Sequence, residues 1–254
     1  MENYFNPLLI TMSLLAVIVF FALFHIRAGY GRFYTRTWGP AVNNRLGWVL
    51  MEAPVFFLML AFCLLSERQS SWPHVLLFLF FEIHYFQRSF VFPMLIRGKG
   101  VMPLSVILMG LLFNALNAVM QGGWIFFVSP DDYYTPSWFT SPQFLAGSLV
   151  FITGMAINLH SDHIIRHLRQ PGDTRHYLPQ QGMFRYVTSA NYFGEFTEWT
   201  GFALLTWSWA GAVFALWTFA NLAPRANAIY DTYKLQFPEA FRQRNLKRIL
   251  PFIY

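Results

Sequence analysis

Charged residues and cysteine are scarce in this sequence of 254 residues, and both shortages restrict what the protein can be. Only 12% of the residues are charged, about half the share found in soluble globular domains, which argues against a soluble protein. The single cysteine, Cys63, excludes an intrachain disulfide framework and a cysteine-rich metal site. Hydrophobic residues make up 56% of the chain, and its mean hydropathy is +0.38. This composition predicts an integral membrane protein.

The sequence also lacks the glycine-rich motifs of the common nucleotide-binding folds. Gly29 and Gly31 lie in the segment GYGRFY, which has neither the third glycine nor the surrounding β-α-β pattern of a dinucleotide-binding loop. A phosphate-binding loop and a nucleophile elbow are absent as well. Any nucleotide would therefore be held by helices and loops, and we predict no Rossmann domain.

Seven apolar segments follow one another along the chain, and each is close to the roughly 20 residues that cross a bilayer. They cover residues 7–24, 46–65, 73–95, 101–128, 144–165, 191–207 and 211–228. The first has no basic stretch before it and no small-residue cleavage site, so we interpret it as an anchor and not as a signal peptide. The last two form one continuous pattern, which we interpret as a hairpin of two short helices hinged at residues 208–211. We predict an all-α integral membrane protein, with seven transmembrane helices in a single domain over residues 1–254.

The basic residues indicate how such a bundle is oriented. With seven spans, every one of the 18 basic residues except Arg68 falls on the same side, and Asp131 and Asp132 lie on the other side with Arg68. Because cytoplasmic loops carry the excess of Lys and Arg, this pattern predicts an outside amino terminus and a cytoplasmic carboxyl terminus. The net charge of +6 then reflects topology, and we expect no nucleic-acid partner.

Several charged residues interrupt the apolar segments, although a charge at the middle of a spanning helix costs about 2.5–3.5 kcal/mol on insertion scales. They are Glu52, Glu82, Arg88, Asp162, Glu195 and Glu198. We expect them to face the bundle or an interface. For Glu82 and Arg88, an interhelical ion pair or hydrogen bond explains their presence at least as well as a chemical role. Counted along the helices, Glu52, Tyr85, Asp162 and Glu195 reach a similar depth in the cytoplasmic half, so we expect them to meet in a cavity.

The densest polar stretch is residues 158–201. Asn158 and Asp162 are four residues apart and share a helix face, and their amide and carboxylate suit ribose hydroxyls or a carboxamide. The arginines between residues 166 and 185 suit phosphates, although ordinary cytoplasmic loops carry such charges too. Three histidines at helical spacing have only Asp162 to complete a ligand set, so we predict no metal site.

Five segments resemble the steroid 5α-reductase family, also called the 3-oxo-5-alpha-steroid 4-dehydrogenases. They are MEAPVF (51–56), HYFQRSFVFP (84–93), GMAINLHSDHIIRHLRQPG (154–172), LPQQGMFRYVTSANYFGEFTEW (178–199) and LPFIY (250–254). The NYFGE…EW block is shared with wider relatives, including isoprenylcysteine methyltransferase-like proteins and sterol reductases. Its combination with Glu52 and HYF is more specific, and the resemblance extends from residue 52 to residue 254.

This resemblance implies a seven-helix reductase that holds NADPH in a cytosol-facing cavity and reduces the C4–C5 double bond of a 3-oxo-Δ4 steroid. Glu52 and Tyr85 would be the catalytic residues and would flank the 3-carbonyl group. The cofactor-binding residues would be Asn158, Asp162, Arg169, His176, Asn191, Glu195, Arg225 and Tyr233, mostly from residues 145–254. The chain departs from the family pattern at Met51, where animal members carry Gln, at His176–Tyr177 in place of Tyr-Arg, and around Ile229 in place of a histidine.

The chemistry explains why such a pair is needed. An enone accepts hydride at its β-carbon when the oxygen that gains negative charge is stabilised, and one well-placed donor lowers the barrier by about 2.7–4 kcal/mol. Tyr85 would be that donor and Glu52 its partner. From the residues alone, Tyr85 also fits an ordinary aromatic contact between helices, because 20% of the chain is aromatic.

Three alternatives remain open at this stage. An isoprenylcysteine-type methyltransferase would use S-adenosylmethionine and would not need Glu52 and Tyr85 together. A polyprenol or enoyl-thioester reductase would use the same hydride chemistry on a linear substrate. A lipid transporter or receptor would bind no NADPH. For the reductase we expect a monomer with a small apolar steroid-like substrate, in the bacterial inner membrane or the endoplasmic reticulum, with its active site open to the cytoplasm.

Overall fold

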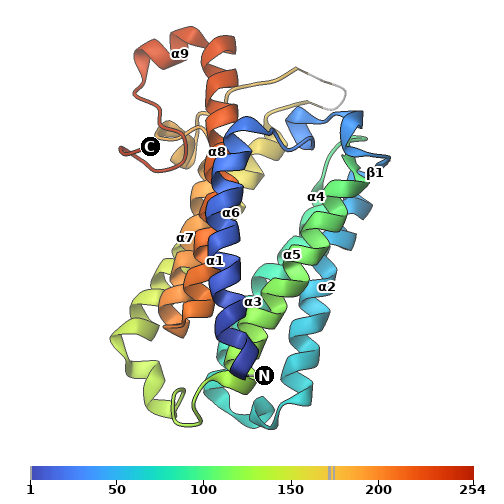
Figure 1. The fold of residues 1–254 in the computed structure, drawn as a ribbon. Helices are drawn as coiled ribbons and strands as arrows, with labels where there is room; N and C mark the ends of the chain where they lie inside the picture. Colours follow the sequence, from blue (N-terminus) through green and yellow to red (C-terminus); the bar gives the residue numbers. More distant parts are fainter. Residues whose placement is uncertain (1, 171–172, 174) are drawn as a thin grey trace.

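The computed structural model describes residues 2–170, 173 and 175–254, and most of them lie in long helices (Figure 1). The long helices are α1 (Glu2–His25), α2 (Asn44–Leu65), α3 (Trp72–Phe86), α5 (Leu104–Gly123), α6 (Pro142–His167), α7 (Ala190–Thr206) and α8 (Trp209–Gln236). Each apolar segment of the sequence therefore forms a helix, which confirms the helical fold class. Pro171 and Gly172, at the end of the 154–172 segment, lie outside the described residues.

Five helical stretches of the described chain are long and apolar enough to cross a membrane. They are Tyr4–His25, Asn44–Leu65, Trp72–Leu95, Leu104–Val128 and Pro142–His167. Because several such helices follow one another, the chain is a multi-pass membrane protein. Helices α7 and α8 fall outside this set, because α7 has only 17 residues and α8 is less apolar along its 28 residues.

The turn between α7 and α8 lies close to its predicted place, but the prediction of two short helices is wrong for α8. Trp207 ends α7 with a φ of 44°, and the Ser208 side chain accepts a hydrogen bond from the Gly211 N–H at the start of α8. Pro224 lies inside α8 and does not end it. The helix ends at Phe237, whose backbone is restricted by the following Pro238. Helix α8 therefore continues eight residues past the predicted end at residue 228.

The short elements connect the long ones. They are η1 (Gly31–Phe33), η2 (Arg36–Trp38), β1 (Ala41–Asn43), η3 (Glu67–Ser70), α4 (Phe92–Leu95), β2 (Val101–Pro103), η6 (Pro136–Thr140), η7 (Gly182–Arg185) and α9 (Pro238–Gln243). Strands β1 and β2 pair antiparallel, with Ala41 opposite Pro103. This ladder holds together the starts of α2 and α5. The Asn43 side chain also caps α2 by accepting hydrogen bonds from the backbone N–H groups of Arg45 and Leu46.

The third apolar segment is one helix with a widened turn. Residues Gln87–Val91 (η4) form a π-helix between α3 and α4, and Trp124–Val128 (η5) form a second one after α5. Pro93 has no N–H, and its ring crowds the carbonyl group four residues earlier, at Ser89. The backbone widens at that place, as π-bulges do near functional sites. The widened turn carries Arg88, whose side chain points into the bundle.

Helices α6 and α7 pack with their backbones nearly in contact. A Cβ atom added to Gly154 would lie 2.2 Å from the backbone nitrogen of Glu198, and one added to Gly201 would lie 2.2 Å from that of Phe151. Small residues permit this close approach between membrane helices, where packing rather than hydrophobic burial holds helices together. The close packing brings the polar face of α6, with Asp162, against the first turns of α7.

The chain termini lie at opposite ends of the bundle (Figure 1). The segment after α1, the β1–β2 ladder, the end of α6 and the end of α8 gather at the end where the carboxyl terminus lies. Arg68 is at the other end, where its guanidinium lies 2.6 Å from the Asp131 carboxylate. The structure thus places the basic connections together at one end, as the charge pattern predicted.

Candidate active site

A large cavity of about 1730 Å³ lies between the helices. Pockets for one small ligand are usually about 300–1,000 Å³, so this cavity has room for two ligands side by side. Nine of the ten residues predicted for the site line it: Glu52, Tyr85, Asp162, Arg169, His176, Asn191, Glu195, Arg225 and Tyr233. They come from five long helices or their connections, far apart in the sequence.

Asn158 is the exception, because it is not among the residues that line the cavity. Its side-chain Nδ2 donates a hydrogen bond of 2.9 Å to the backbone carbonyl of Asn191. The predicted direct contact between Asn158 and a cofactor is therefore not what the geometry offers. Asn158 lies behind the cavity wall and holds the first turn of α7, which carries Asn191 and Glu195.

Asn114, on α5, joins Glu52 to Tyr85. Its Nδ2 donates to Glu52 Oε2 at 3.0 Å and to the backbone oxygen of Met51 at 2.9 Å. The Tyr85 hydroxyl donates to Asn114 Oδ1 at 3.5 Å and accepts a bond of 3.0 Å from Asn117 Nδ2. Among the described residues, Glu52 and Tyr85 share no direct hydrogen bond, so the amide is the link between the acid and the phenol.

Sequence reasoning missed both asparagines of α5. A signal was present, because Asn114 and Asn117 are two amides three residues apart in an otherwise apolar segment, and polar groups inside a membrane span are usually functional. Gln121 extends the row: its Nε2 donates to Asn117 Oδ1 at 3.2 Å and to the backbone oxygen of Ala210 at 2.9 Å. The amide row thereby fixes the Tyr85 side of the cavity to α8.

Arg88 lies between two carboxylates in the cavity wall. Its guanidinium nitrogens are 3.5 Å from Asp162 Oδ2 and 3.5 Å from Glu195 Oε2, and the group lies over the rings of Trp48 and Phe92. The predicted ion pair of Arg88 is confirmed. Such a buried pair fixes geometry more than it stabilises the fold, because desolvation offsets the attraction.

Glu82, in contrast to Arg88, forms no interhelical ion pair or hydrogen bond among the described residues. Both of its carboxylate oxygens are buried and have no hydrogen-bond partner among the described residues, so the predicted interhelical bond is wrong for Glu82. Glu82 is not among the residues that line the cavity, where the other carboxylates find their partners.

His84 and Glu198 form a further buried pair at the cavity. The Nδ1 atom of His84 is 2.8 Å from Glu198 Oε1. The His84 ring stacks edge-on against Trp199, with 4.5 Å between the ring centroids, and lies 5.1 Å from the ring of Tyr85. Glu198 faces the bundle as predicted, but its pairing with His84 was not foreseen, because the spacing along the chain contains no hint of it.

Basic side chains surround one part of the cavity. Besides the predicted residues, the wall contains Arg45, Arg97, Lys99 and Arg166. Burial, with the charges of Arg32 and Arg169 nearby, lowers the pKa of His176 from its ordinary value of 6.5, because a second positive charge is disfavoured there. At neutral pH, His176 is therefore an uncharged group among cations.

Asp173, Arg175 and Tyr177, in the segment before η7, are linked by hydrogen bonds. Arg175 donates two side-chain hydrogen bonds of 3.1 Å to Asp173, and the Tyr177 hydroxyl donates a third of 2.6 Å. These bonds hold the pKa of the Asp173 carboxyl well below its usual range. Asp173, His176 and Tyr177 all line the cavity, so the loop forms part of its wall.

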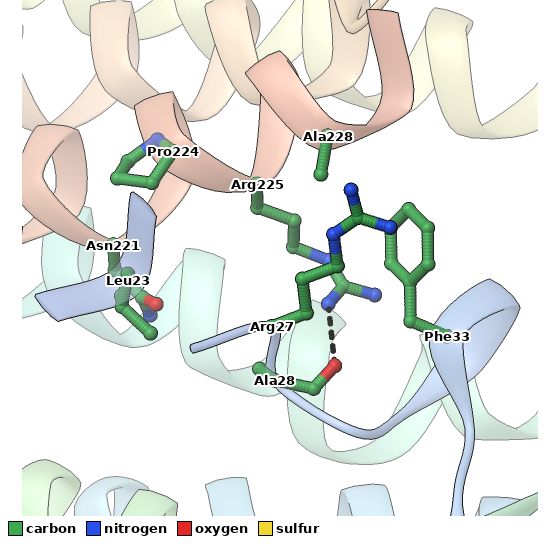
Figure 2. Close-up of a pocket in the computed structure, with 8 residues that line it drawn as sticks. All are labelled: Leu23, Arg27, Ala28, Phe33, Asn221, Pro224, Arg225 and Ala228. Atoms are coloured by element: carbon green, nitrogen blue, oxygen red, sulfur yellow. Dashed lines mark hydrogen bonds between the residues drawn. The ribbon is translucent and has the colours of Figure 1, made fainter. Parts of the chain in front are cut away.

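Arg225, on α8, holds the segment that follows α1. Its Nε donates to the Tyr192 hydroxyl at 2.8 Å, and its terminal nitrogens donate to the backbone oxygens of Tyr30 at 3.1 Å and Ala28 at 3.5 Å. Figure 2 shows the bond to Ala28, with Arg27 and Phe33 beside the guanidinium. Arg225 therefore links α8 and α7 to the segment after α1 at the edge of the cavity.

The donor set fits a nicotinamide dinucleotide. Apart from the 3.5 Å ion pair with Arg88, the buried Asp162 Oδ2 atom has no hydrogen-bond partner among the described residues, which leaves it able to accept from a ribose hydroxyl. The Asn191 side chain supplies an amide, and the arginines around the cavity supply phosphate ligands. A carboxylate, an amide and several guanidinium groups are the partners that such a cofactor needs.

Comparisons with known proteins agree with this geometry. Residues 100–254 match the family model described as 3-oxo-5-alpha-steroid 4-dehydrogenase. The chain is 37% identical over 243 residues to the 3-oxo-5-alpha-steroid 4-dehydrogenase 1 of Bos taurus, covering 94% of this chain and 93% of the relative. It is 40% identical over 228 residues to the Homo sapiens protein of the same name, covering 89% and 86%.

Similarity extends to plants: the Steroid 5-alpha-reductase DET2 of Arabidopsis thaliana is 34% identical over 259 residues, covering 100% of this chain and 98% of the relative. These alignments include the helices that carry Glu52 and Tyr85 as well as the matched region from residue 100 onward. The chain therefore belongs to the 3-oxo-5-alpha-steroid 4-dehydrogenase family of oxidoreductases.

Proposed function

We propose that this protein is a membrane-embedded, NADPH-dependent reductase of the C4–C5 double bond of 3-oxo-Δ4 steroids. The relatives are named for this steroid chemistry. The observation that carries the proposal is the Glu52–Asn114–Tyr85 chain in the wall of a cavity that also contains Asp162 and Asn191. One part of the cavity suits a ketone, and another suits a dinucleotide.

Tyr85 and Glu52 would act on the steroid 3-carbonyl group. NADPH, when bound, supplies a hydride, which adds to C5 and moves negative charge onto the carbonyl oxygen. The Tyr85 hydroxyl now donates a long bond of 3.5 Å to Asn114, which it can exchange for a stronger bond to that oxygen. Glu52 in its acid form adds a second donor, and Asn114 holds its other oxygen in place. Both donors become stronger as charge develops, which lowers the barrier.

The residues toward the basic side of the cavity would hold the cofactor. Asp162 and Glu195 would accept from ribose hydroxyls, and Asn191 would bind through its amide. Arg169, His176, Arg225 and Tyr233 would bind the phosphates, and Asn158 would support the site from behind through the Asn191 carbonyl. The C-terminal part, residues 145–254, thus supplies most of the cofactor site in one continuous domain.

We also infer the topology. Helices α7 and α8 cross the membrane with the five more apolar stretches, which gives seven spans, an outside amino terminus and a cytoplasmic carboxyl terminus. The supporting observation is the gathering of the basic connections at the end of the bundle where the carboxyl terminus lies. The active site would open to the cytoplasm, where NADPH is found. We propose a monomer in the bacterial inner membrane or the endoplasmic reticulum.

In the deciding experiment, protein purified in detergent is incubated with NADPH and either a 3-oxo-Δ4 steroid or a polyprenol. We expect the steroid to gain two hydrogens by mass analysis and the polyprenol to stay unchanged. Membership in an oxidoreductase family leaves the methyltransferase and transporter alternatives without support. A polyprenol reduced in place of the steroid would instead favour the linear-substrate reductase.

A further inference from the structure

The pair His84–Glu198 is a second acid-backed polar group in the cavity, and the chemistry described above does not use it. The two side chains are almost completely buried, with exposed fractions of 7% and 1%. The second oxygen of Glu198, Oε2, is buried without a hydrogen-bond partner among the described residues. A structural link between α3 and α7 would not require an ionisable pair at this place, where each buried charge is costly.

The free nitrogen of the His84 ring is reachable from the cavity. Its Nδ1 atom is taken by Glu198, and His84 itself lines the cavity next to Tyr85. The Nε2 atom has no hydrogen-bond partner in the described part of the chain, and it is not fully buried. The buried His74 on the same helix differs, because its Nε2 atom is enclosed and unpartnered.

The proposed reduction needs a proton donor as well as a hydride. Tyr85 and Glu52 face the carbonyl oxygen, but the carbon next to the carbonyl group must receive a proton. Arg88 holds its proton permanently and is paired with two carboxylates. A histidine whose far nitrogen is held by a carboxylate is a group that binds and releases a proton near neutral pH.

We propose, on the basis of the function proposed above, that His84 Nε2 donates the proton to C4 of the substrate and that Glu198 is the positioning residue that orients the ring. Hydride addition to C5 moves the π electrons into a C3–C4 double bond, with the charge on the oxygen at C3. Those electrons then form the C4–H bond as the Nε2–H bond breaks, and the C3 carbonyl re-forms. The neutral imidazole keeps its Nδ1 hydrogen on Glu198 and regains a proton from water.

The test runs the reaction in D2O with ordinary NADPH and reads the configuration of deuterium at C4 of the product by NMR. For the wild-type protein we expect deuterium in one configuration only, because a fixed donor reaches one face of the substrate. For His84→Asn, whose amide can still bond to Glu198, we expect a roughly 100-fold lower kcat and deuterium in both configurations. The NADPH Kd should stay within about twofold, since no cofactor contact is removed.

His74→Asn is the matched control, since His74 is a buried histidine on the same helix that does not line the cavity. It should leave kcat and the C4 configuration unchanged. Glu198→Gln should lower kcat by about tenfold, leave the steroid KM unchanged and partly mix the C4 configurations. Unlabelled product incubated with each protein in D2O corrects for exchange at C4.

The possible results separate this inference from the proposed function. A wild-type product labelled in both configurations would overturn the role of His84, whether or not the variants fold. His84→Asn with unchanged kcat and a single configuration would overturn it too, while steroid reduction stands. A wild-type protein that reduces no steroid would overturn the proposed function, and this inference with it.

Discussion

Asn114 shows how a single residue can set up the proposed chemistry without taking part in it. An amide has a donor on one side and an acceptor on the other, so it can bond to a carboxyl group and a phenol at the same time. In this site its Nδ2 donates a hydrogen bond to the Glu52 carboxyl group, and its Oδ1 accepts one from the Tyr85 hydroxyl. The two proposed catalytic groups are thereby held on one side of the cavity, where both could bond to a common oxygen atom.

Tyr85→Phe tests that arrangement at the level of one atom. Loss of the hydroxyl removes one donor to the carbonyl oxygen, so we expect kcat to fall about 100- to 1,000-fold with an unchanged NADPH Kd. Single-turnover oxidation of NADPH followed by absorbance measures the first quantity, and fluorescence titration the second. Tyr134→Phe is the control, because the Tyr134 hydroxyl is buried outside the cavity, where it donates to the backbone oxygen of Thr206. Turnover of Tyr85→Phe within threefold of wild type would count against Tyr85.

His176 predicts a pH effect on cofactor binding. Its pKa lies below 6.5 in the free protein because of burial and the cations Arg32 and Arg169, so it is neutral at pH 7. Phosphates beside it would raise that pKa, and binding would then take up a proton. The Kd of the wild-type protein for NADPH should therefore decrease as the pH falls from 7.5 to 6, and His176→Gln should lack this decrease. Identical pH dependence of Kd in both proteins would place His176 away from the phosphates.

The same lowered pKa has a consequence for stability. A base with a folded-state pKa below its unfolded value binds fewer protons when folded, so stability rises with pH across the window between the two values. For His176 this window lies below 6.5. His176 therefore lowers the free energy of unfolding only slightly at pH 7, and lowers it further as the pH falls.

At the level of elements, the packing of α6 on α7 positions Asp162 and the start of α7. Gly154→Ala would push a methyl group to 2.2 Å from the backbone of Glu198, where backbone cannot yield as a flexible side chain can. We expect a loss of about 1–3 kcal/mol of stability, a lower Tm in detergent and weaker NADPH binding. Gly100→Ala is the control for the Tm, because the atoms nearest to its Cβ belong to Asn44, at an ordinary 3.6 Å. An unchanged Tm for Gly154→Ala would contradict the view that the close packing of α6 on α7 stabilises the protein.

The elements were largely predictable from sequence, and the exceptions have local causes. Long apolar runs are a strong signal, so every predicted span corresponds to a helix. The length of α8 was missed because its polar end reads as a loop on hydropathy, although nothing in it ends a helix. The β1–β2 ladder and the π turn around Arg88 were missed as well. The first pairs residues that are far apart in the sequence, such as Val42 with Met102, and the second depends on Pro93 acting against a packed helix.

At the level of the whole molecule, the site is made of residues that only the fold brings together. Glu52, Asn114 and Glu195 come from α2, α5 and α7, and no sequence spacing relates them. Residue counts along each helix predict depth, and depth correctly grouped Glu52, Tyr85, Asp162 and Glu195. They do not predict which face of a helix points inward. That is why Asn158 proved to lie behind the wall, and why the partners of Glu52 and His84 were found only in the structure.

The charge distribution over the whole molecule, by contrast, could be predicted without the fold. Loops between helices have to lie at one end of the bundle or the other, so their order along the chain assigns each basic residue to an end. The connections between α2 and α3 and between α5 and α6, which hold Arg68 and its partner Asp131, lie at the end away from the carboxyl terminus. The proposed cytoplasmic opening of the cavity depends on this pattern.

A structure of the protein with NADP⁺ and a 3-oxo-Δ4 steroid bound is the most direct test of the proposed site. We expect the steroid 3-oxygen within hydrogen-bond distance of both the Tyr85 hydroxyl and the Glu52 carboxyl, the nicotinamide ring over C5, and the phosphates among the arginines near Arg169. A steroid bound with its 3-oxygen away from Glu52 and Tyr85, or a nicotinamide ring far from both, would contradict the proposed chemistry.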